Sequence, residues 1–283
     1  MGNANRLFRR GVTFIVIMAF TIFAAFPFYW MLLTSFKSDR DLYIRSLKLN
    51  PLVFNDVPTL KNFDLLFNQT NYSQFLLNSI FIGAVVVLIT LVAAVPAAYS
   101  LARLSGRRGE WLGIGIFMVY LIPPTLLFIP LARVVSVLRL QDSVWALIVL
   151  YPTFTIPFCT WLLMGFMKTL PKEVEEQALV DGCSRLGAMV RIVIPLAVPG
   201  ILTVIVFAFM LTMHEFIYAL AFVSSSSQKT ISIGVTTELI RGDVYFWQAL
   251  MAGAIIVALP VSLLYNFFLD RFVAGFTLGA VKG

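Results

Sequence analysis

The sequence contains little charge and very few cysteine or histidine residues. Only 12% of its 283 residues are charged, whereas soluble domains carry about 25%. We expect no disulfide, because Cys159 lies in an apolar run and Cys183 in a charged loop, and no CxxC spacing suggests a metal. The one histidine, His214, excludes a multi-histidine metal site. These absences exclude disulfide-rich secreted domains, disordered chains and ordinary soluble enzymes.

Long apolar runs take the place of the missing charge, with 60% hydrophobic residues and a mean hydropathy of +0.91. A helix needs about 20 apolar residues to cross a hydrocarbon core of about 30 Å. Six windows of that length contain no Asp, Glu, Lys or Arg: Val12–Leu33, Asn78–Ala102, Trp111–Ala132, Ser143–Met167, Ile192–Met213 and Gln248–Leu269. The sequence therefore predicts an all-α polytopic membrane protein with six transmembrane helices, and one transmembrane domain over residues 1–283.

Prolines lie inside or near these windows, among them Pro96, Pro123, Pro124 and Pro157. Neighbouring helices or a water-filled cavity must then satisfy the carbonyls that proline leaves free. Helices bent around a solute path and helices that are simply kinked by packing are both consistent with this pattern.

The basic residues predict the orientation. Arg6, Arg9 and Arg10 precede a first window that is longer than the apolar core of a signal peptide, about 7–15 residues. With the N-terminus in the cytoplasm, 12 of the 21 Lys and Arg residues fall on the cytoplasmic side, including the arginines of the Gly106–Gly109 turn. Both termini and a C-terminal tail at residues 270–283 are expected in the cytoplasm.

The windows also lack the groups that would power transport. Carriers coupled to ion gradients usually place ionisable residues at mid-membrane, and a nucleotide-driven protein needs a phosphate-binding loop such as GxxxxGK[ST]. Neither feature is present in the sequence. Uphill transport by this chain would require a partner that supplies energy, and a surface on which that partner docks.

The segment at residues 168–191 is a candidate for that surface, because it carries eight charges between two apolar windows. Pro171 and acidic residues favour the start of a helix of about nine residues over Glu173–Asp181. Gly182 is placed to end this helix in the left-handed conformation, and Ser184 can cap the next one. An ordinary helical loop is the alternative.

Two sets of residues resemble a known family. Glu176-Gln177-Ala178, then Gly182, then Ile192-Val193-Ile194-Pro195 resemble the EAA signature of the membrane subunits of binding-protein-dependent ABC importers, although Gln177 and Cys183 replace residues that are usually small. Further segments resemble the carbohydrate branch, the maltose-type second permease: Pro27–Leu32, Ser35–Lys37, Asn78-Ser79, Ala97–Arg103, Ile122–Pro124 and Gly279–Gly283.

The resemblance implies a type I ABC importer permease fold, in the cell inner (plasma) membrane. It implies a heterodimer with a second permease, two ABC ATPase subunits that bind ATP and Mg, and an extracytoplasmic solute-binding protein. In that reading residues 168–191 form the cytoplasmic EAA loop, whose coupling helix contacts the ATPase. Its ATPase-coupling residues are Glu173, Glu176, Ala178, Asp181, Gly182 and Arg185. The chain itself is then no enzyme and has no cofactor, and its dispersed basic residues do not favour nucleic acid.

A candidate solute path follows the fifth window, at His214, Glu215, Phe216 and Tyr218. Hydrogen-bonding and aromatic side chains of this kind bind sugars, and anchoring at the membrane interface is the alternative for His214. The polar stretch Ser224–Lys229 is either a contact for the binding protein or a solvated linker.

The sequence thus predicts a permease subunit that translocates a sugar or oligosaccharide by alternating access. One alternative is the same architecture with another solute, such as glycerol phosphate, a polyamine or phosphate. The other is a polytopic membrane protein without a transport role, which would be expected to cluster carboxylates or histidines at a membrane face.

Overall fold

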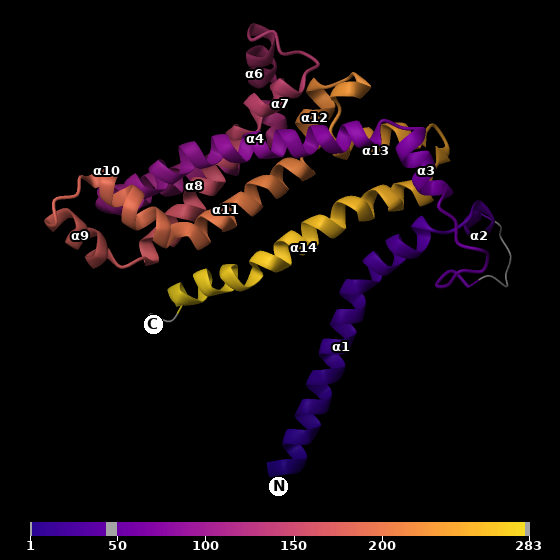
Figure 1. The fold of residues 1–283 in the computed structure, drawn as a ribbon, viewed down its shortest axis with the longest axis horizontal. Helices are drawn as coiled ribbons and strands as arrows, with labels where there is room; N and C mark the ends of the chain where they lie inside the picture. The colour runs from indigo at the N-terminus through magenta and orange to yellow at the C-terminus, as the bar shows by residue number, and fades with distance from the viewer. Residues whose placement is uncertain (1, 44–49, 281–283) are drawn as a thin grey trace. The chain divides into compact units, whose positions relative to one another are not determined.

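The structure is a computed structural model that describes residues 2–43 and 50–280. This part of the chain is almost entirely helical (Figure 1), and its one strand pairing is a two-residue antiparallel hairpin. The elements in chain order are α1 (Gly2–Ser35), α2 (Asp39–Tyr43), α3 (Lys61–Asn68), α4 (Tyr72–Tyr99), the π-helical η1 (Ser100–Leu104), α5 (Gly106–Tyr120), α6 (Pro124–Val137), α7 (Val144–Leu150), α8 (Pro152–Thr169), α9 (Lys172–Val180), α10 (Arg185–Ala188), the π-helical η2 (Met189–Val193), α11 (Ile194–His214), α12 (Ile217–Phe222), the 3-10 turn η3 (Ser226–Gln228), α13 (Ile231–Leu239), β1 (Ile240–Arg241), β2 (Val244–Tyr245) and α14 (Trp247–Ala280).

Within the described ranges, four helices are long and apolar enough to cross a membrane. They coincide with the first, second, fourth and fifth predicted windows, apart from Ser143, which caps the third of these helices. The four helices are Phe8–Ser35, Tyr72–Leu104, Val144–Thr169 and Arg185–His214. The agreement follows from composition, since an uncharged run of this length forms a helix in which every backbone group is bonded internally.

The third window differs from a single straight helix. It is divided between α5 and α6, which meet at an angle of 87° and count as a fifth span only if they are taken together. The break falls at Ile122-Pro123-Pro124, where proline removes amide donors and disfavours helical geometry in the residue before it. The sixth window lies within α14, of which Trp247–Leu263 is apolar helix in the part of the chain whose side chains are described. Six spans therefore stay a prediction.

The chain divides into two compact units, of which the first combines Met1–Tyr72 with Val235–Pro260. Its best-defined feature is the turn after α1. Nζ of the buried Lys37 lies 3.6 Å from Oδ1 of Asp41, and it donates a hydrogen bond to the Pro51 carbonyl at 2.9 Å. Asn62 donates to the carbonyls of Ser35 and Lys37, both at 2.9 Å. These bonds satisfy the buried charges and fix the exit from α1.

The second unit combines Ser73–Gly234 with Val261–Gly283, and its core lies between α4, α8 and α11. Small residues allow these helices to approach closely, as is common between helices in membranes. At Gly200 in α11, a Cβ atom would lie only 2.5 Å from the ring of Phe166 in α8.

Two ends of this second unit carry the features that matter for function. At one end α9 packs against α10 and η2, and at the other α12 packs against α6 and α7 (Figure 1). We call these the α9 end and the α12 end. Of the predicted tail, residues 270–280 belong to α14, and Val281, Lys282 and Gly283 lie outside the described residues.

Candidate functional site

The helix α9 at the α9 end is built as its local sequence predicts. It covers nine residues and is preceded by Pro171, whose φ of −58° suits a helix start. At its other end Gly182 has φ +88°, a left-handed conformation that favours glycine. The amides of Gly182 and Cys183 donate to the Leu179 and Ala178 carbonyls at 3.1 and 3.0 Å, which closes the end of the helix.

A second cap begins the following helix. The Ser184 hydroxyl oxygen accepts a hydrogen bond from the Gly187 amide at 3.1 Å, as an N-cap residue should. The end of α9 and the start of α10 are therefore both capped, and the left-handed Gly182 lies between them. As a result α9 forms a short, rigid segment between α8 and α11.

The predicted coupling residues lie on two faces of this segment. Ala178 is buried against the rest of the unit, while Gly182 and Arg185 are exposed. The exposed acids lie around a shallow hollow of 510 Å³, which is lined by Glu173, Glu176, Gln177, Val180 and Asp181. Val180 was not foreseen as a surface residue, but its side chain is 87% exposed. The outer face of α9 is therefore acidic with an apolar centre.

Glu175 is one of the eight charges of the 168–191 segment, and it is buried. Its carboxylate accepts a hydrogen bond from the Tyr99 hydroxyl and lies 3.4 Å from Nε of Arg103. Arg103 also donates from Nη2 to the Leu170 carbonyl at 2.9 Å, directly before α9 begins. No local pattern in the sequence predicts this cluster, because Arg103 and Glu175 are 72 positions apart.

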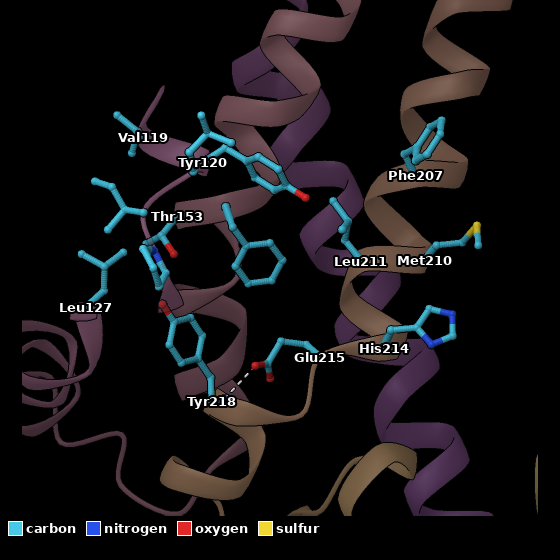
Figure 2. A pocket seen from close by; sticks show the side chains of 14 residues that line it. Val119, Tyr120, Leu127, Thr153, Phe207, Met210, Leu211, His214, Glu215 and Tyr218 are labelled. Carbon is cyan, nitrogen blue, oxygen red and sulfur yellow. Dashed lines mark hydrogen bonds between the residues drawn. The ribbon is translucent and has the colours of Figure 1, made fainter. Parts of the chain in front are cut away.

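A cavity of 640 Å³ opens near the α12 end (Figure 2). Its lining residues come from α5, the α5–α6 break, α6, α8, α11 and α12: Val119, Tyr120, Leu121, Ile122, Pro123, Leu127, Thr153, Phe154, Phe207, Met210, Leu211, His214, Glu215 and Tyr218. Three of the four residues predicted for the solute path, His214, Glu215 and Tyr218, line this cavity. Phe216 does not, and it is exposed outside the lining.

The lining is mainly apolar, and Glu215 is its one carboxylate. Tyr120, Phe154, Phe207 and Tyr218 contribute rings, and Thr153 and His214 contribute polar groups. The sequence did not single out Tyr120, Thr153, Phe154 or Phe207, because they lie within apolar windows and only the packing of three helices brings them together. No lysine or arginine occurs among these lining residues.

Glu215 is held by partners within the chain. One carboxylate oxygen accepts from the Tyr218 amide at 2.7 Å (Figure 2). The other accepts from the Ala219 amide at 3.0 Å and the Tyr151 hydroxyl at 2.9 Å. These amides belong to the first turn of α12, which has no helical partner for them. Glu215 thus caps α12 and ties it to the buried Tyr151.

The stretch at residues 224–229, which we call the serine loop, is anchored by Asp142. The Asp142 carboxylate accepts from the Ser224 and Ser225 amides at 2.7 and 2.8 Å and from the Ser225 hydroxyl. These hydrogen bonds, first among them that of the Ser225 side chain, lower the pKa of Asp142 below its ordinary value. Asn78 donates to two carbonyls of the same loop at 2.9 Å.

Metal and disulfide chemistry find no support in the described part of the chain. No group of three or more His, Cys, Asp or Glu residues there could hold a metal ion. Cys159 is buried and Cys183 is partly exposed, and both are free.

These features define a polytopic helical membrane protein with a capped acidic helix at one end and an aromatic cavity near the other. Residues 91–277 match the family described as the binding-protein-dependent transport system inner membrane component. The chain belongs to this family. It is therefore an inner-membrane protein and a permease component of a transport system, not a catalytic enzyme.

Individual relatives support the assignment along the whole chain. A sulfoquinovosyl glycerol transport system permease protein from Agrobacterium fabrum is 32% identical, over 95% of this chain and 93% of that protein. A trehalose/maltose transport system permease protein from Thermococcus litoralis is 28% identical, over 95% and 94%. The crystal structure of a bacterial ABC transporter that imports the acidic polysaccharide alginate has the same fold, with a TM-score of 0.79, 16% identity, and coverage of 96% of this chain and 99% of that chain.

Proposed function

We propose that this chain is the permease subunit of an ATP-driven ABC importer, and that its solute is a sugar or oligosaccharide. The observation that carries the proposal is α9, a nine-residue helix capped at Gly182 that presents acids around an exposed Val180. A rigid segment between two long helices can be displaced as a unit by a partner protein that binds it. The relatives named above for sulfoquinovosyl glycerol and for trehalose and maltose support the solute class.

The topology belongs to the proposal. The chain forms one transmembrane domain of type I importer fold with six spans, in which the bent α5–α6 pair and α14 supply the third and sixth. Both termini, the 168–191 loop and the tail at residues 270–283 lie in the cytoplasm. The α12 end and the serine loop then face the extracytoplasmic side.

The partners follow from the same arrangement. The chain pairs with a second permease, and two ABC ATPase subunits hold ATP and Mg on the cytoplasmic side. A solute-binding protein docks from outside, next to the serine loop. We assign contact with the ATPase to Glu173, Glu176, Asp181 and Arg185, with Ala178 packed inward and Gly182 setting the turn.

Transport proceeds by alternating access. Closure of the ATPase dimer on ATP displaces α9, and the displacement turns the attached helices between inward- and outward-facing states. ATP is hydrolysed in the ATPase subunits, so this chain contributes only binding surfaces and helices that move as rigid bodies.

The residues that line the cavity favour a neutral sugar over the alternative solutes, which are glycerol phosphate, a polyamine and phosphate. A phosphate or glycerol phosphate would need a cation, and the lining contains no lysine or arginine. A polyamine would need free carboxylates, and the one carboxylate in the lining, Glu215, already accepts three hydrogen bonds. Aromatic rings with a few hydrogen-bonding groups suit the faces and hydroxyls of a sugar.

The test is purification of the complete complex, followed by measurement of solute uptake and ATPase activity in proteoliposomes. We expect an ATPase to co-purify, and a sugar with its binding protein to stimulate hydrolysis. His214→Ala should raise the KM for transport several-fold, whereas Phe216→Ala, outside the cavity lining, should not. A complex that contains no ATPase would refute the proposed function, and equal KM values for the two variants would refute the solute path.

A further inference from the structure

The base of α9 contains a buried polar cluster that joins α9 to the end of α4. The side chains of Arg103 and Glu175 are only 4% and 9% exposed, and their nearest charged atoms are 3.4 Å apart. The Tyr99 hydroxyl, from the last residue of α4, donates to the same carboxylate. Surface ion pairs contribute little to stability, but loss of one partner from a buried pair is strongly disruptive.

Arg103 holds α9 at two positions. Its Nε faces Glu175 within the helix, and its Nη2 donates to the Leu170 carbonyl two residues before the helix begins, at 2.9 Å. Leu170 follows α8, so the covalent connection alone would let α9 pivot about Pro171. The hydrogen bond to Leu170 and the ion pair with Glu175 restrict that freedom, because one guanidinium then contacts both the segment before α9 and the first turn of α9.

The cluster lies beside π-helical turns. Arg103 is within η1, which continues α4, and α9 packs against η2, which leads into α11. Such turns are rare and occur mostly as single turns inside α-helices, frequently at functional sites. Both connections from the α9 end to the long helices therefore contain a turn of this kind.

Within the described chain, Nε and Nη1 of Arg103 are both buried and have no hydrogen-bond partner. Nε therefore meets the Glu175 carboxylate as an ion pair and not as a hydrogen bond. Loss of either partner would leave an uncompensated buried charge, so the charge attraction keeps the two side chains together.

We propose that Arg103 and Glu175 are positioning residues for coupling: their buried ion pair locks α9 to η1, so that displacement of α9 by the ATPase is passed directly to α4. This inference rests on the proposed function. It adds a third helix to the two, α8 and α11, that are joined to α9 through the chain. Neither residue contacts solute or nucleotide in this account.

The test uses the assembled transporter in proteoliposomes. Glu175→Gln keeps the shape of the side chain and removes its charge, and we expect the amount of solute moved per ATP to fall at least tenfold while ATPase activity persists. The double variant Arg103→Glu/Glu175→Arg restores opposite charges but not the hydrogen bond to the Leu170 carbonyl, so it should recover part of the loss. Tyr99→Phe, a milder change that leaves the ion pair, should lower the ratio by a smaller factor.

The matched control is the exposed ion pair between Lys168 and Glu110, which are 2.9 Å apart and join α8 to α5. Glu110→Gln removes a charge near the same end of the unit and should leave the solute moved per ATP unchanged. A ratio that is also unchanged in Glu175→Gln would overturn the proposal. So would equal losses of assembly, ATPase activity and transport in Glu175→Gln and Tyr99→Phe, because these indicate a structural role alone.

A distance measurement tests the lock directly. Spin labels at Leu104→Cys in η1 and Lys172→Cys in α9, both exposed positions, are placed in a Cys183→Ala background. The distance between them should be the same without nucleotide and with a non-hydrolysable ATP analogue, and should differ between the two states in Glu175→Gln. A distance that already differs in the unmodified pair contradicts the lock. If the native complex lacks an ATPase, the proposed function fails, whereas a native complex with unchanged Glu175→Gln coupling refutes only this inference.

Discussion

The role of Glu215 can be tested by comparing variants that remove different numbers of its hydrogen bonds. Glu215→Ala removes all three: two to the first turn of α12 and one from the buried Tyr151 hydroxyl. Loss of a helix cap costs about 1 kcal/mol, and leaving a buried hydroxyl without its acceptor costs about 2 kcal/mol. We therefore expect Glu215→Ala to lower the free energy of unfolding by about 3 kcal/mol.

Two smaller changes should have nearly equal effects. In Glu215→Gln the amide nitrogen must replace one carboxylate oxygen, so at least one donor faces another donor and one hydrogen bond is lost. Tyr151→Phe also loses one bond, and either change should cost about 1 kcal/mol. Gln141→Ala, an exposed position at the same end, is the control and should be neutral.

The assay is thermal unfolding of the purified complex, together with the KM for solute uptake. The expected order of stability is Gln141→Ala, then Glu215→Gln together with Tyr151→Phe, then Glu215→Ala. If Glu215→Ala unfolds at the native temperature, the capping role is wrong. If Glu215→Gln raises the KM and Tyr151→Phe does not, Glu215 binds solute directly and does not act through α12.

Three further predictions concern other parts of the chain. Gly182→Ala places a side chain at φ +88°, at a cost of about 1–2 kcal/mol, and should uncouple ATP hydrolysis from uptake. The control is Gly165→Ala, whose Cβ would have no atom within 4 Å and which should leave coupling unchanged. Normal uptake per ATP in Gly182→Ala would contradict this prediction. Asp142→Ala should increase hydrogen exchange of the serine-loop amides at neutral pH. Because the pKa of Asp142 is lowered, the native loop should keep its bonds until the pH falls below the ordinary value of 3.8, and exchange that is already fast at pH 6 would disprove the anchor. In Gly200→Val the new side chain would clash with the Phe166 ring, so the complex should be destabilised by about 1–3 kcal/mol in thermal unfolding. Phe166→Ala should partly rescue this loss. Equal unfolding temperatures for Gly200→Val and the native chain would argue against the contact.

Local signals in the sequence were sufficient for the helices and for the turn at α9. The start near Pro171, the end at Gly182 and the cap at Ser184 all lie within a few residues of the helices that they bound, and all three occur as predicted. The 87° break in the third window was not predicted, although Pro123 and Pro124 marked its place. A proline pair shows that a helix is interrupted, but the angle depends on what the two halves pack against.

The two sites show the limit of such signals. Glu173 and Glu175 are two positions apart and chemically identical, yet one lies on the exposed face of α9 and the other is buried against Arg103. Similarly, Glu215 and Phe216 are adjacent, but only Glu215 lines the cavity. A helix period of 3.6 residues separates faces, and only packing against a distant segment decides which face is covered.

The sequence by itself determined that this is a helical membrane protein without its own energy source, because charge-free runs of about 20 residues can satisfy their backbone only as helices in lipid. Only the tertiary structure decided that Arg103 meets Glu175, that Glu215 caps α12, and that rings from four helices line one cavity. Composition and local capping act over neighbouring residues, whereas these contacts join positions tens of residues apart, and their partners become adjacent only when the helices pack.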